Sequence, residues 1–340
     1  MVVLAAAVPA LLAAFVFTLS VGSEPVPLSA VWQWLVGRGT GDDGLTTLLV
    51  EFHLPRALTA LAAGAGLAVV GLLMQTLFAN PLADPYILGV SSGASLGVAI
   101  SVLGTGGAAV SFTAAFGPLG RWGTVVAGGI GALLVLALVL LAGRWVRTVV
   151  SLLVIGVMVG SAVGAVVSLL LAFADPARVQ KFVLWSLGSV NGTYSGDMAA
   201  LLPVVGAGIA MAMLISPSLN ALLLGERYAA SMGVHVRRIR LVAIVATALV
   251  CGVVTAFCGP IAFLGIAVPH LARALVGRND HRWLVPTCAV VGGIVCLLCA
   301  VVATLPVADG VLPLNVVTAV IGAPVVVIVL LRSRALAAGQ

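Results

Sequence analysis

The chain of 340 residues is 62% hydrophobic and only 8% charged, whereas soluble domains are about 45–50% apolar and about 25% charged. This composition excludes a water-soluble globular fold and predicts a protein of the lipid bilayer. The net charge is +6 and the chain contains 40 glycines, which are frequent where membrane helices pack closely. The basic excess does not imply nucleic-acid binding, because in a membrane protein the sidedness of basic residues is more informative than their total.

Uncharged apolar runs predict ten membrane-spanning helices, since a span needs roughly 20 apolar residues. The runs are continuous rather than alternating, which favours helices over strands. The first run lacks the basic start of a signal peptide and is long enough to span. In chain order the predicted spans are residues 2–20, 54–78, 87–105, 122–142, 149–173, 198–216, 239–257, 260–276, 284–304 and 314–331. We therefore expect an all-α integral membrane protein with one transmembrane domain over residues 1–340.

An even number of spans places both termini on one side, and the basic residues of alternate loops indicate which side. One set of loops and helix ends holds eleven of them: Arg144, Arg147, Arg227, Arg237, Arg238, Arg240, Arg273, Arg278, Arg282, Arg332 and Arg334. The other set holds five: Arg38, Arg56, Arg121, Arg178 and Lys181. Because basic residues accumulate in cytoplasmic loops, we expect a multi-pass protein of the cytoplasmic membrane with both termini in the cytoplasm.

Glycine stripes and proline breaks mark three of the predicted spans, the third, the fifth and the eighth. Glycine recurs at every fourth position in the third and fifth spans: Gly89, Gly93 and Gly97, then Gly156, Gly160 and Gly164. Such stripes favour close helix packing within the chain, and a transport path or a subunit interface is the alternative. Residues 80–85 interrupt the chain before one short span, and Gly259, Pro260 and Pro269 bracket another. Broken helices at matching places in two halves are typical of transporter pathways.

The residue types that enzymes use are scattered along the chain. The four histidines lie in separate loops or helix ends, and no hydrolase or zinc-protease motif is present. Cys296 and Cys299 lack further ligands nearby, so no metal site is predicted. A Walker loop needs a lysine after glycine, but the single lysine, Lys181, follows Gln180. We therefore expect a protein that is not an enzyme and is not its own ATPase.

The charges also argue against an ion-driven carrier, which normally keeps ionisable groups within its spans. Nearly every charge here lies in a loop or at a helix end. Gln75 is the clearest polar side chain inside a span, and a helix-helix hydrogen bond explains it as well as a pathway role does. We expect the energy for transport to come from outside the chain. An ion-coupled secondary transporter is the alternative of a different class, followed by an intramembrane enzyme.

The largest polar segment on the predicted cytoplasmic side covers residues 220–240. Its interior, from Glu226 to Met232, has the pattern of a short amphipathic helix, and Gly233 is suited to end it. A short helix held away from the membrane by a basic stem is suited to docking with a partner. A solvated loop between two spans is the alternative.

Several motifs, spread over nearly the whole chain, resemble one family of permeases. They are His53–Arg56, Gly64, Gly71, Gln75, Asn80–Pro85, Leu88–Ala94, Trp185–Ser189, Leu224–Glu226, Met232–Val234, Gly259–Gly265, Pro269–Arg273, Asp280–Arg282 and Gly322–Pro324. In this order they closely resemble the FecCD-type permeases of type II ABC importers, which take up iron-siderophores, haem and cobalamin.

The resemblance implies a transport subunit that works with partners. These are a second permease chain in a homodimer or heterodimer, two cytoplasmic ATP-binding subunits and an extracytoplasmic substrate-binding protein. It implies no covalently bound cofactor in this chain, with ATP and Mg²⁺ used by the partner subunits. The expected activity is import of an iron chelate by alternating access. Ferric siderophore is the expected cargo because it is the commonest in the family, and haem or cobalamin is the alternative.

The resemblance also assigns roles to individual residues by motif match. Residues 220–240 become the coupling segment, which seats in the ATPase through Leu224, Gly225, Glu226, Arg227, Ser231, Met232 and Gly233. The gate or pathway residues are Gln75, Asn80, Leu82, Gly89 and Gly93. The residues expected to dock the binding protein are His53 and Arg56.

The chain departs from the family pattern at four positions. His53 stands where an arginine is common, Ala300 and Thr304 replace an aspartate and an arginine, and Asn315 replaces a glycine. Fewer outward arginines predict weaker salt-dependent docking of a binding protein. A heterodimer whose partner supplies the missing charges would explain this, as would a differently charged binding protein.

Overall fold

Ten apolar helices dominate the part of the chain that the computed structural model describes, residues 2–22, 24–103, 121–142, 145, 149–307 and 310–338. They are α1 (Val2–Ser20), α4 (Leu54–Leu77), α5 (Val90–Leu103), α7 (Arg121–Ala142), α8 (Val149–Ala172), α10 (Met198–Leu222), α12 (Val236–Cys258), α13 (Leu264–Val276), α14 (His281–Ala303) and α15 (Leu314–Ala338). Seven are long and apolar enough to cross a membrane, and α5, α13 and the part of α15 from Leu314 to Ile328 are shorter apolar helical stretches among the described residues. The predicted all-α membrane fold is confirmed.

Some predictions fall on parts of the chain that are not described. Residues 104 and 105 of the third predicted span lie outside the described residues. Arg144 and Arg147 of the orientation count also lie outside them, and the side chains of Arg121, Arg332 and Arg334 are not described.

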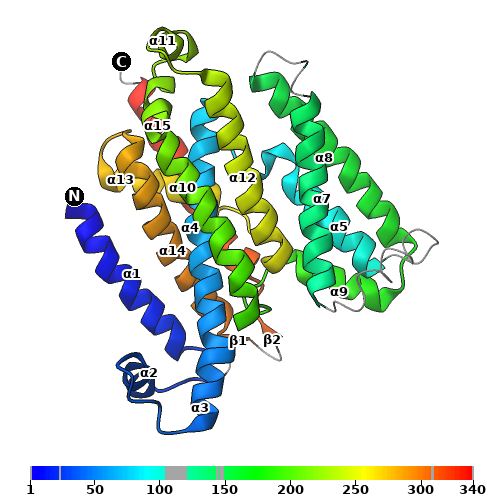
Figure 1. Ribbon diagram of the computed structural model, residues 1–340, viewed down its shortest axis with the longest axis vertical. Helices are drawn as coiled ribbons and strands as arrows, with labels where there is room; N and C mark the ends of the chain where they lie inside the picture. The colour runs from blue at the N-terminus through cyan, green and yellow to red at the C-terminus, as the bar shows by residue number, and fades with distance from the viewer. Residues whose placement is uncertain are drawn as a thin grey trace.

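α4 lies at the centre of the larger of two groups of helices (Figure 1). It is buried over almost its whole length and packs against α1, α10, α12, α13 and α14. The second group contains α5, α7, α8 and the short α9 (Pro176–Ser186), and it joins the first through α12. α8 leaves most of its surface uncovered within this chain, so lipid or another subunit must cover that face.

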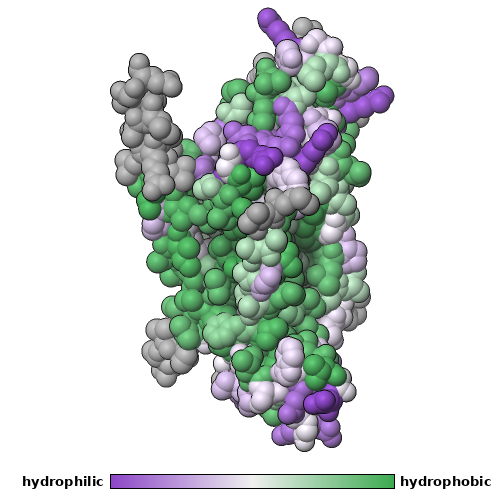
Figure 2. All heavy atoms as spheres, turned by 90° about the vertical axis from the view of Figure 1, so that its left-hand side faces the viewer, coloured by the Kyte–Doolittle hydropathy of each residue, from purple (hydrophilic) through white to green (hydrophobic). Residues whose placement is uncertain are grey.

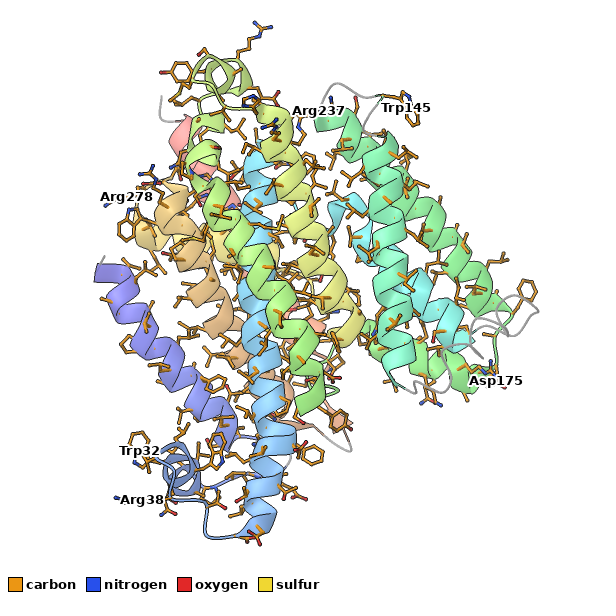
Figure 3. The ribbon with its side chains drawn as sticks, in the orientation of Figure 1. Trp32, Arg38, Trp145, Asp175, Arg237 and Arg278 are labelled. Carbon is orange, nitrogen blue, oxygen red and sulfur yellow. The ribbon has the colours of Figure 1, made fainter. Side chains whose placement is uncertain are left out.

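The outer surface has the polarity of a membrane protein. Figure 2 shows a broad apolar band across the middle of one face, with polar residues gathered above and below it. Figure 3 places Arg237 at the end of the molecule where α11 (Glu226–Ser231) lies, and Arg38 at the opposite end, beside α2 (Leu28–Leu35). We refer to these as the α11 end and the α2 end.

Two helices begin later than the predicted spans, because a residue in the left-handed backbone conformation precedes each of them. The span expected from residue 87 begins as α5 only at Val90, because a 3₁₀ turn (Pro85–Leu88) precedes it and Gly89 has φ +75°. The span expected from residue 260 begins as α13 at Leu264, after Phe263 with φ +69°. Such a residue cannot continue a right-handed helix, so both helices are short.

The apolar runs did not reveal the smaller elements. These are α2, α3 (Asp43–Leu48) with a π turn (Leu49–His53) that continues into α4, α9 and the 3₁₀ turn Ser195–Asp197. The short helix predicted for Glu226–Met232 is present as α11. A two-residue strand β1 (Pro306–Val307) also pairs antiparallel with β2 (Gly310–Val311) before α15. This pair lies outside the predicted spans and is too short to change the fold class.

Glycines bring helix backbones into direct contact. A Cβ on Gly64 would fall on the carbonyl oxygen of Gly292 in α14, and one on Gly71 would fall on that of Gly265 in α13. These contacts explain how α4 is surrounded so tightly. They have the small-residue packing that holds membrane helices together without a hydrophobic driving force.

A matched pair in α7 tests this packing. Gly131→Ala should lower the free energy of unfolding by about 1–3 kcal/mol, because its Cβ would fall on the carbonyl oxygen of Gly93 in α5 and overpacking strains neighbouring backbone. Gly129→Ala, two residues away with open space around it, should be tolerated. Thermal unfolding of the two variants in detergent checks this, and equal melting temperatures would contradict it.

Candidate functional site

A short exposed helix follows α10 at the α11 end. Gly225 lies between α10 and α11 and has φ +103°. Its carbonyl oxygen accepts the first hydrogen bond of α11, from Ala229 N–H (3.0 Å). The helix ends at Ser231, and Gly233 follows with φ +82° and donates its N–H to Ala230 O (3.0 Å). Because glycine adopts positive φ without strain, a glycine stands at each end of this helix. The sequence predicted the start at Glu226 and the role of Gly233 at the end, but it placed the last residue at Met232 rather than Ser231 and did not predict the role of Gly225 at the start.

The surface of this helix is turned away from the rest of the chain. Ala229 is fully buried and anchors it, whereas Leu224, Tyr228 and Met232 are 64%, 54% and 60% exposed. Glu226 Oε1 accepts a hydrogen bond from Arg240 Nη2 (2.7 Å), which ties the helix to the start of α12. Three large, mostly apolar side chains are thus uncovered next to a single buried residue, and such a surface is suited to burial against a partner.

Gln75 is held inside the helical bundle near the same end. Its Nε2 donates to the carbonyl oxygens of Gly265 (3.3 Å) and Ile266 (3.2 Å) in α13, and its Oε1 accepts from Arg273 Nη1 (2.6 Å). Only 3% of Gln75 is exposed. These contacts give the amide a helix-helix role within the chain, which is one of the two interpretations left open by the sequence.

The Asn80–Pro81–Leu82 turn lies directly after α4 and is exposed. Asn80 Oδ1 accepts from Leu82 N–H (2.9 Å), and Asn80 O accepts from Ala83 N–H (3.1 Å). The following Asp84 caps the next turn by accepting from Tyr86 N–H (2.7 Å), and burial raises the pKa of this carboxyl. Asn80 and Leu82 thus lie on a compact turn with free surface, at the α11 end of α4.

The two glycines expected near the gate contact other helices of the same chain. A Cβ on Gly93 would fall on the carbonyl oxygen of Gly131 in α7, and Gly89 faces Gly156 and Gly160 of α8. Gly164, the last member of the second stripe, has open space around it. The contacts of Gly89 and Gly93 are those of intramolecular packing, the favoured interpretation of the stripe.

The prediction that His53 and Arg56 are exposed for docking needs correction. Both were expected to face a binding protein, but they are only 4% and 6% exposed. The ring nitrogen Nδ1 of His53 lies 2.7 Å from Leu19 O, and Arg56 Nη2 donates to Thr18 O (2.7 Å) and Val21 O. The two side chains therefore fasten the end of α1 to α4, because the carbonyl oxygens at the end of a helix lack partners within it.

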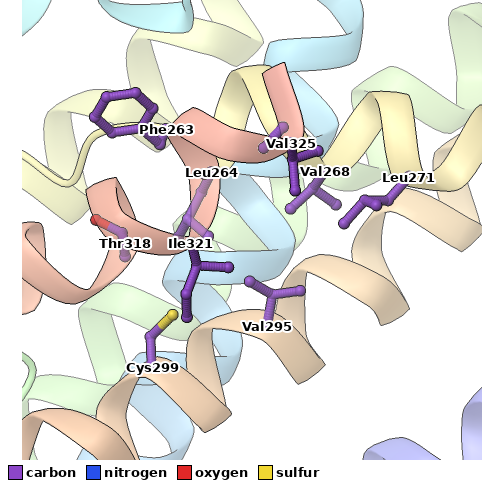
Figure 4. A pocket seen from close by; sticks show the side chains of 11 residues that line it. Phe263, Leu264, Val268, Leu271, Val295, Cys299, Thr318, Ile321 and Val325 are labelled. Atoms are coloured by element: carbon purple, nitrogen blue, oxygen red, sulfur yellow. The ribbon is translucent and has the colours of Figure 1, made fainter. Parts of the chain in front are cut away.

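An apolar crevice lies between α13, α14 and α15 (Figure 4). Phe263, Val268, Val295, Ile321 and Val325 are among its lining residues, and Thr318 and Cys299 are also at its edge. The enclosed space would hold no more than a water or two, so it is a packing crevice rather than a site for a large cargo.

Several polar residues that connect helices were not recognised as site candidates from the sequence. Asn220, His281 and Thr76 form hydrogen bonds between α10, α14 and α4 at the α11 end. Asn315, noted only as a departure from the family, accepts from Ala262 N–H (3.0 Å) and donates to Pro260 O (2.7 Å). It thereby holds the broken backbone before α13. The only signal for them in the sequence was the presence of polar residues at the ends of apolar runs.

The helices and the exposed segment together define a class of protein. Ten apolar helices, proline-containing breaks before two of them and a short exposed helix are features of a multi-pass transport permease. Among the described residues no group of His, Cys, Asp or Glu is arranged to hold a metal ion.

Comparison with known proteins identifies the family. The model of the FecCD transport family matches residues 10–332. The vitamin B12 import system permease proteins BtuC of Salmonella paratyphi A and Salmonella typhi are each 36% identical over 304 residues, covering 88% of this chain and 87% of theirs. The chain belongs to the FecCD family and is an ABC importer permease, a transport subunit of the inner membrane rather than an enzyme.

Solved structures agree with this assignment. A metal-chelate type ABC transporter in an inward-facing conformation is similar with a TM-score of 0.83 and 28% identity, over 97% of this chain and 98% of that one. PsaBC from Streptococcus pneumoniae in complex with Fab has a TM-score of 0.56 at 16% identity, over 84% of this chain and 93% of that one. The second likeness concerns the fold alone.

Proposed function

We propose that this chain carries a bulky metal chelate across the membrane by alternating access, driven by ATP hydrolysis in separate subunits. The observation that carries the proposal is the exposed α11, where the chain leaves Leu224, Tyr228 and Met232 uncovered and buries Ala229. A helix of this kind gains stability when a partner covers it. In an ABC importer that partner is the ATPase, and Leu224, Gly225, Glu226, Arg227, Ser231, Met232 and Gly233 are the residues we assign to the contact.

Three kinds of partner would complete the transporter around this chain. A second permease chain, identical or different, would complete the path, and two ATP-binding subunits would bind ATP and Mg²⁺ below it. An extracytoplasmic binding protein would deliver the cargo. The uncovered face of α8 supports the second permease chain, and the missing Walker lysine supports a separate ATPase.

We further propose that the α11 end faces the cytoplasm. Arg237 and Arg278 lie in the half of the molecule nearer α11, whereas Arg38 and Asp175 lie toward the other end (Figure 3). This distribution supports the charge count made from the sequence, because cytoplasmic loops are enriched in basic residues. In this orientation Asn80 and Leu82 lie on the cytoplasmic side, where we propose that they form the gate.

The cargo we propose is a metal chelate, with vitamin B12 first among those to test. The curated relatives are named as vitamin B12 permeases, and the similar structure is described as a metal-chelate transporter. Ferric siderophore, the cargo expected from the family resemblance, is the second candidate. Haem is the third.

Uptake by the complete complex in liposomes tests this proposal. We expect ATP-dependent accumulation of one labelled cargo among cyanocobalamin, a ferric siderophore and haem, each supplied with its binding protein. Replacing ATP by a non-hydrolysable analogue should stop accumulation. Accumulation driven by a proton or sodium gradient without nucleotide would refute the proposal and favour an ion-coupled carrier.

A further inference from the structure

One side chain connects the end of α10 to the start of α14. Asn220 Oδ1 accepts hydrogen bonds from the backbone N–H and from Nδ1 of His281, each at 2.8 Å. Asn220 Nδ2 donates to Asp280 Oδ1 (2.6 Å), which caps α14 by accepting from Arg282 N–H (3.0 Å). Asn220 thus uses three hydrogen bonds on one neighbouring helix, although it lies only five residues before Gly225 and the docking helix.

The charge at this junction is well defined. Hydrogen bonds from the Arg282 N–H and the Asn220 amide hold the pKa of Asp280 below its ordinary value. The carboxylate is therefore ionised at neutral pH and remains an acceptor for the Asn220 amide.

His281 continues the connection to α4. The histidine is 1% exposed, and its Nε2 lies 2.7 Å from the hydroxyl oxygen of Thr76. Because Nδ1 donates its proton to Asn220, Nε2 of the neutral ring is left as an acceptor facing the Thr76 hydroxyl, whose single proton is shared between Nε2 and Leu72 O (2.9 Å). Thr76 lies four residues before Asn80, in the last turn of α4. The path from the docking helix to the proposed gate therefore passes through three side chains on three helices.

A second contact fixes the same turn of α4 from the other side. The neighbouring Gln75 is bonded to Arg273 and to two carbonyl oxygens of α13. The end of α4 is consequently held by α13 and by α14, and among these contacts Thr76 and His281 alone lead to α10.

We propose that Asn220, His281 and Thr76, here called the polar bridge, transmit movement of the coupling segment to the gate at Asn80 and Leu82. This inference rests on the proposed function, since it needs an ATPase that moves the segment. These hydrogen bonds are partly shielded from water, which makes them stronger and more directional than bonds on the open surface, and we expect them to make the ends of α10, α14 and α4 move together. The three residues are positioning residues, because none of them is placed against cargo or ATPase.

The bridge predicts uncoupling rather than simple loss of activity. In the reconstituted complex, Asn220→Leu and Thr76→Val each keep the side-chain shape and remove the hydrogen bonds. We expect cargo transported per ATP hydrolysed to fall about tenfold in either variant, with ATP hydrolysis close to the wild-type rate. Thr76→Ser retains the hydroxyl, so this variant should keep the wild-type ratio of cargo transported to ATP hydrolysed.

Ser216→Ala is the matched control in α10. Ser216 is as buried as His281, and its hydroxyl donates only to Ala212 O (2.9 Å), within its own helix. This variant should transport at the wild-type ratio. The double variant of Asn220→Leu with Thr76→Val should be no worse than either single one, because both break the same bridge.

The outcomes separate the bridge from the proposed function. A wild-type ratio in both Asn220→Leu and Thr76→Val would overturn the bridge while leaving the importer intact. Equal losses of uptake and hydrolysis, together with less assembled complex, would also overturn it, because they indicate a purely structural role. If the wild-type complex itself shows no ATP-dependent uptake of any cargo, the proposed function fails first.

Discussion

Gly225→Pro should abolish ATP-driven uptake while the helical bundle still inserts into the membrane. Gly225 has φ +103° and donates its N–H to Leu222 O (3.0 Å). Proline fixes φ near −65° and has no N–H, so α11 would lose its start and its orientation. The segment is exposed, and few contacts within the chain would be lost. Uptake and the amount of inserted protein are measured in parallel.

Gly277→Pro provides the control for this substitution. Gly277 also has positive φ (+67°) and open space around it, and it donates its N–H to Arg273 O (2.9 Å). It ends α13 at the same end of the molecule but lies outside the coupling segment. We expect this variant to keep measurable uptake. Loss in both variants alike, or uptake by Gly225→Pro, would contradict a specific role for the α11 helix.

Charge reversal at Glu226 tests the same contact without backbone strain. Its ion pair with Arg240 is 2.7 Å long and Glu226 is 56% exposed, so the pair should contribute only about 0–1 kcal/mol to stability. Glu226→Arg should nevertheless abolish coupled uptake. Combining it with Arg240→Glu restores an internal ion pair, and we expect no recovery if the carboxylate faces the ATPase. Recovery of uptake in the double variant would show that Glu226 only positions α11 and does not contact the ATPase.

Arg56→Glu should destabilise the permease itself. The buried guanidinium donates to Thr18 O and Val21 O, and a glutamate there would place an uncompensated charge against two carbonyl oxygens. We expect a loss of about 3–5 kcal/mol in the free energy of unfolding, measured by thermal unfolding in detergent.

Arg38→Glu is the control for Arg56, because Arg38 is an exposed basic residue at the same end of the molecule (Figure 3). This variant should unfold as the wild type does. A stable Arg56→Glu protein whose binding-protein affinity falls most at low salt would instead support the original expectation of surface docking.

The sequence predicted the helices well because the bilayer leaves few choices. Apolar runs of sufficient length become spanning helices, and each of the ten predicted spans corresponds to one helix. The starts at Val90 and Leu264 were displaced because Gly89 and Phe263 adopt positive φ, which a count of apolar residues does not detect. α2 and α9 were missed because their 8 and 11 residues are too few to span.

The site was predicted only where its features are local. The short helix α11 was predicted from its local amphipathic pattern and from Gly233, which has the positive φ expected of a glycine that ends a helix. The role of Arg56 depends instead on residues 35 and 38 positions away in the chain, and the contact between Asn220 and His281 joins residues 61 positions apart. Such pairs are formed by helix packing, and one sequence contains no direct signal for them.

Reconstitution with and without the ATPase tests the central claim most directly. Liposomes containing the permease dimer and its ATP-binding subunits, with cargo-loaded binding protein outside and ATP inside, should accumulate cargo only when ATP is hydrolysed. Liposomes containing the permease alone should accumulate none, even with an ion gradient imposed. Accumulation of cargo by the permease alone would contradict the claim that this chain depends on a separate motor.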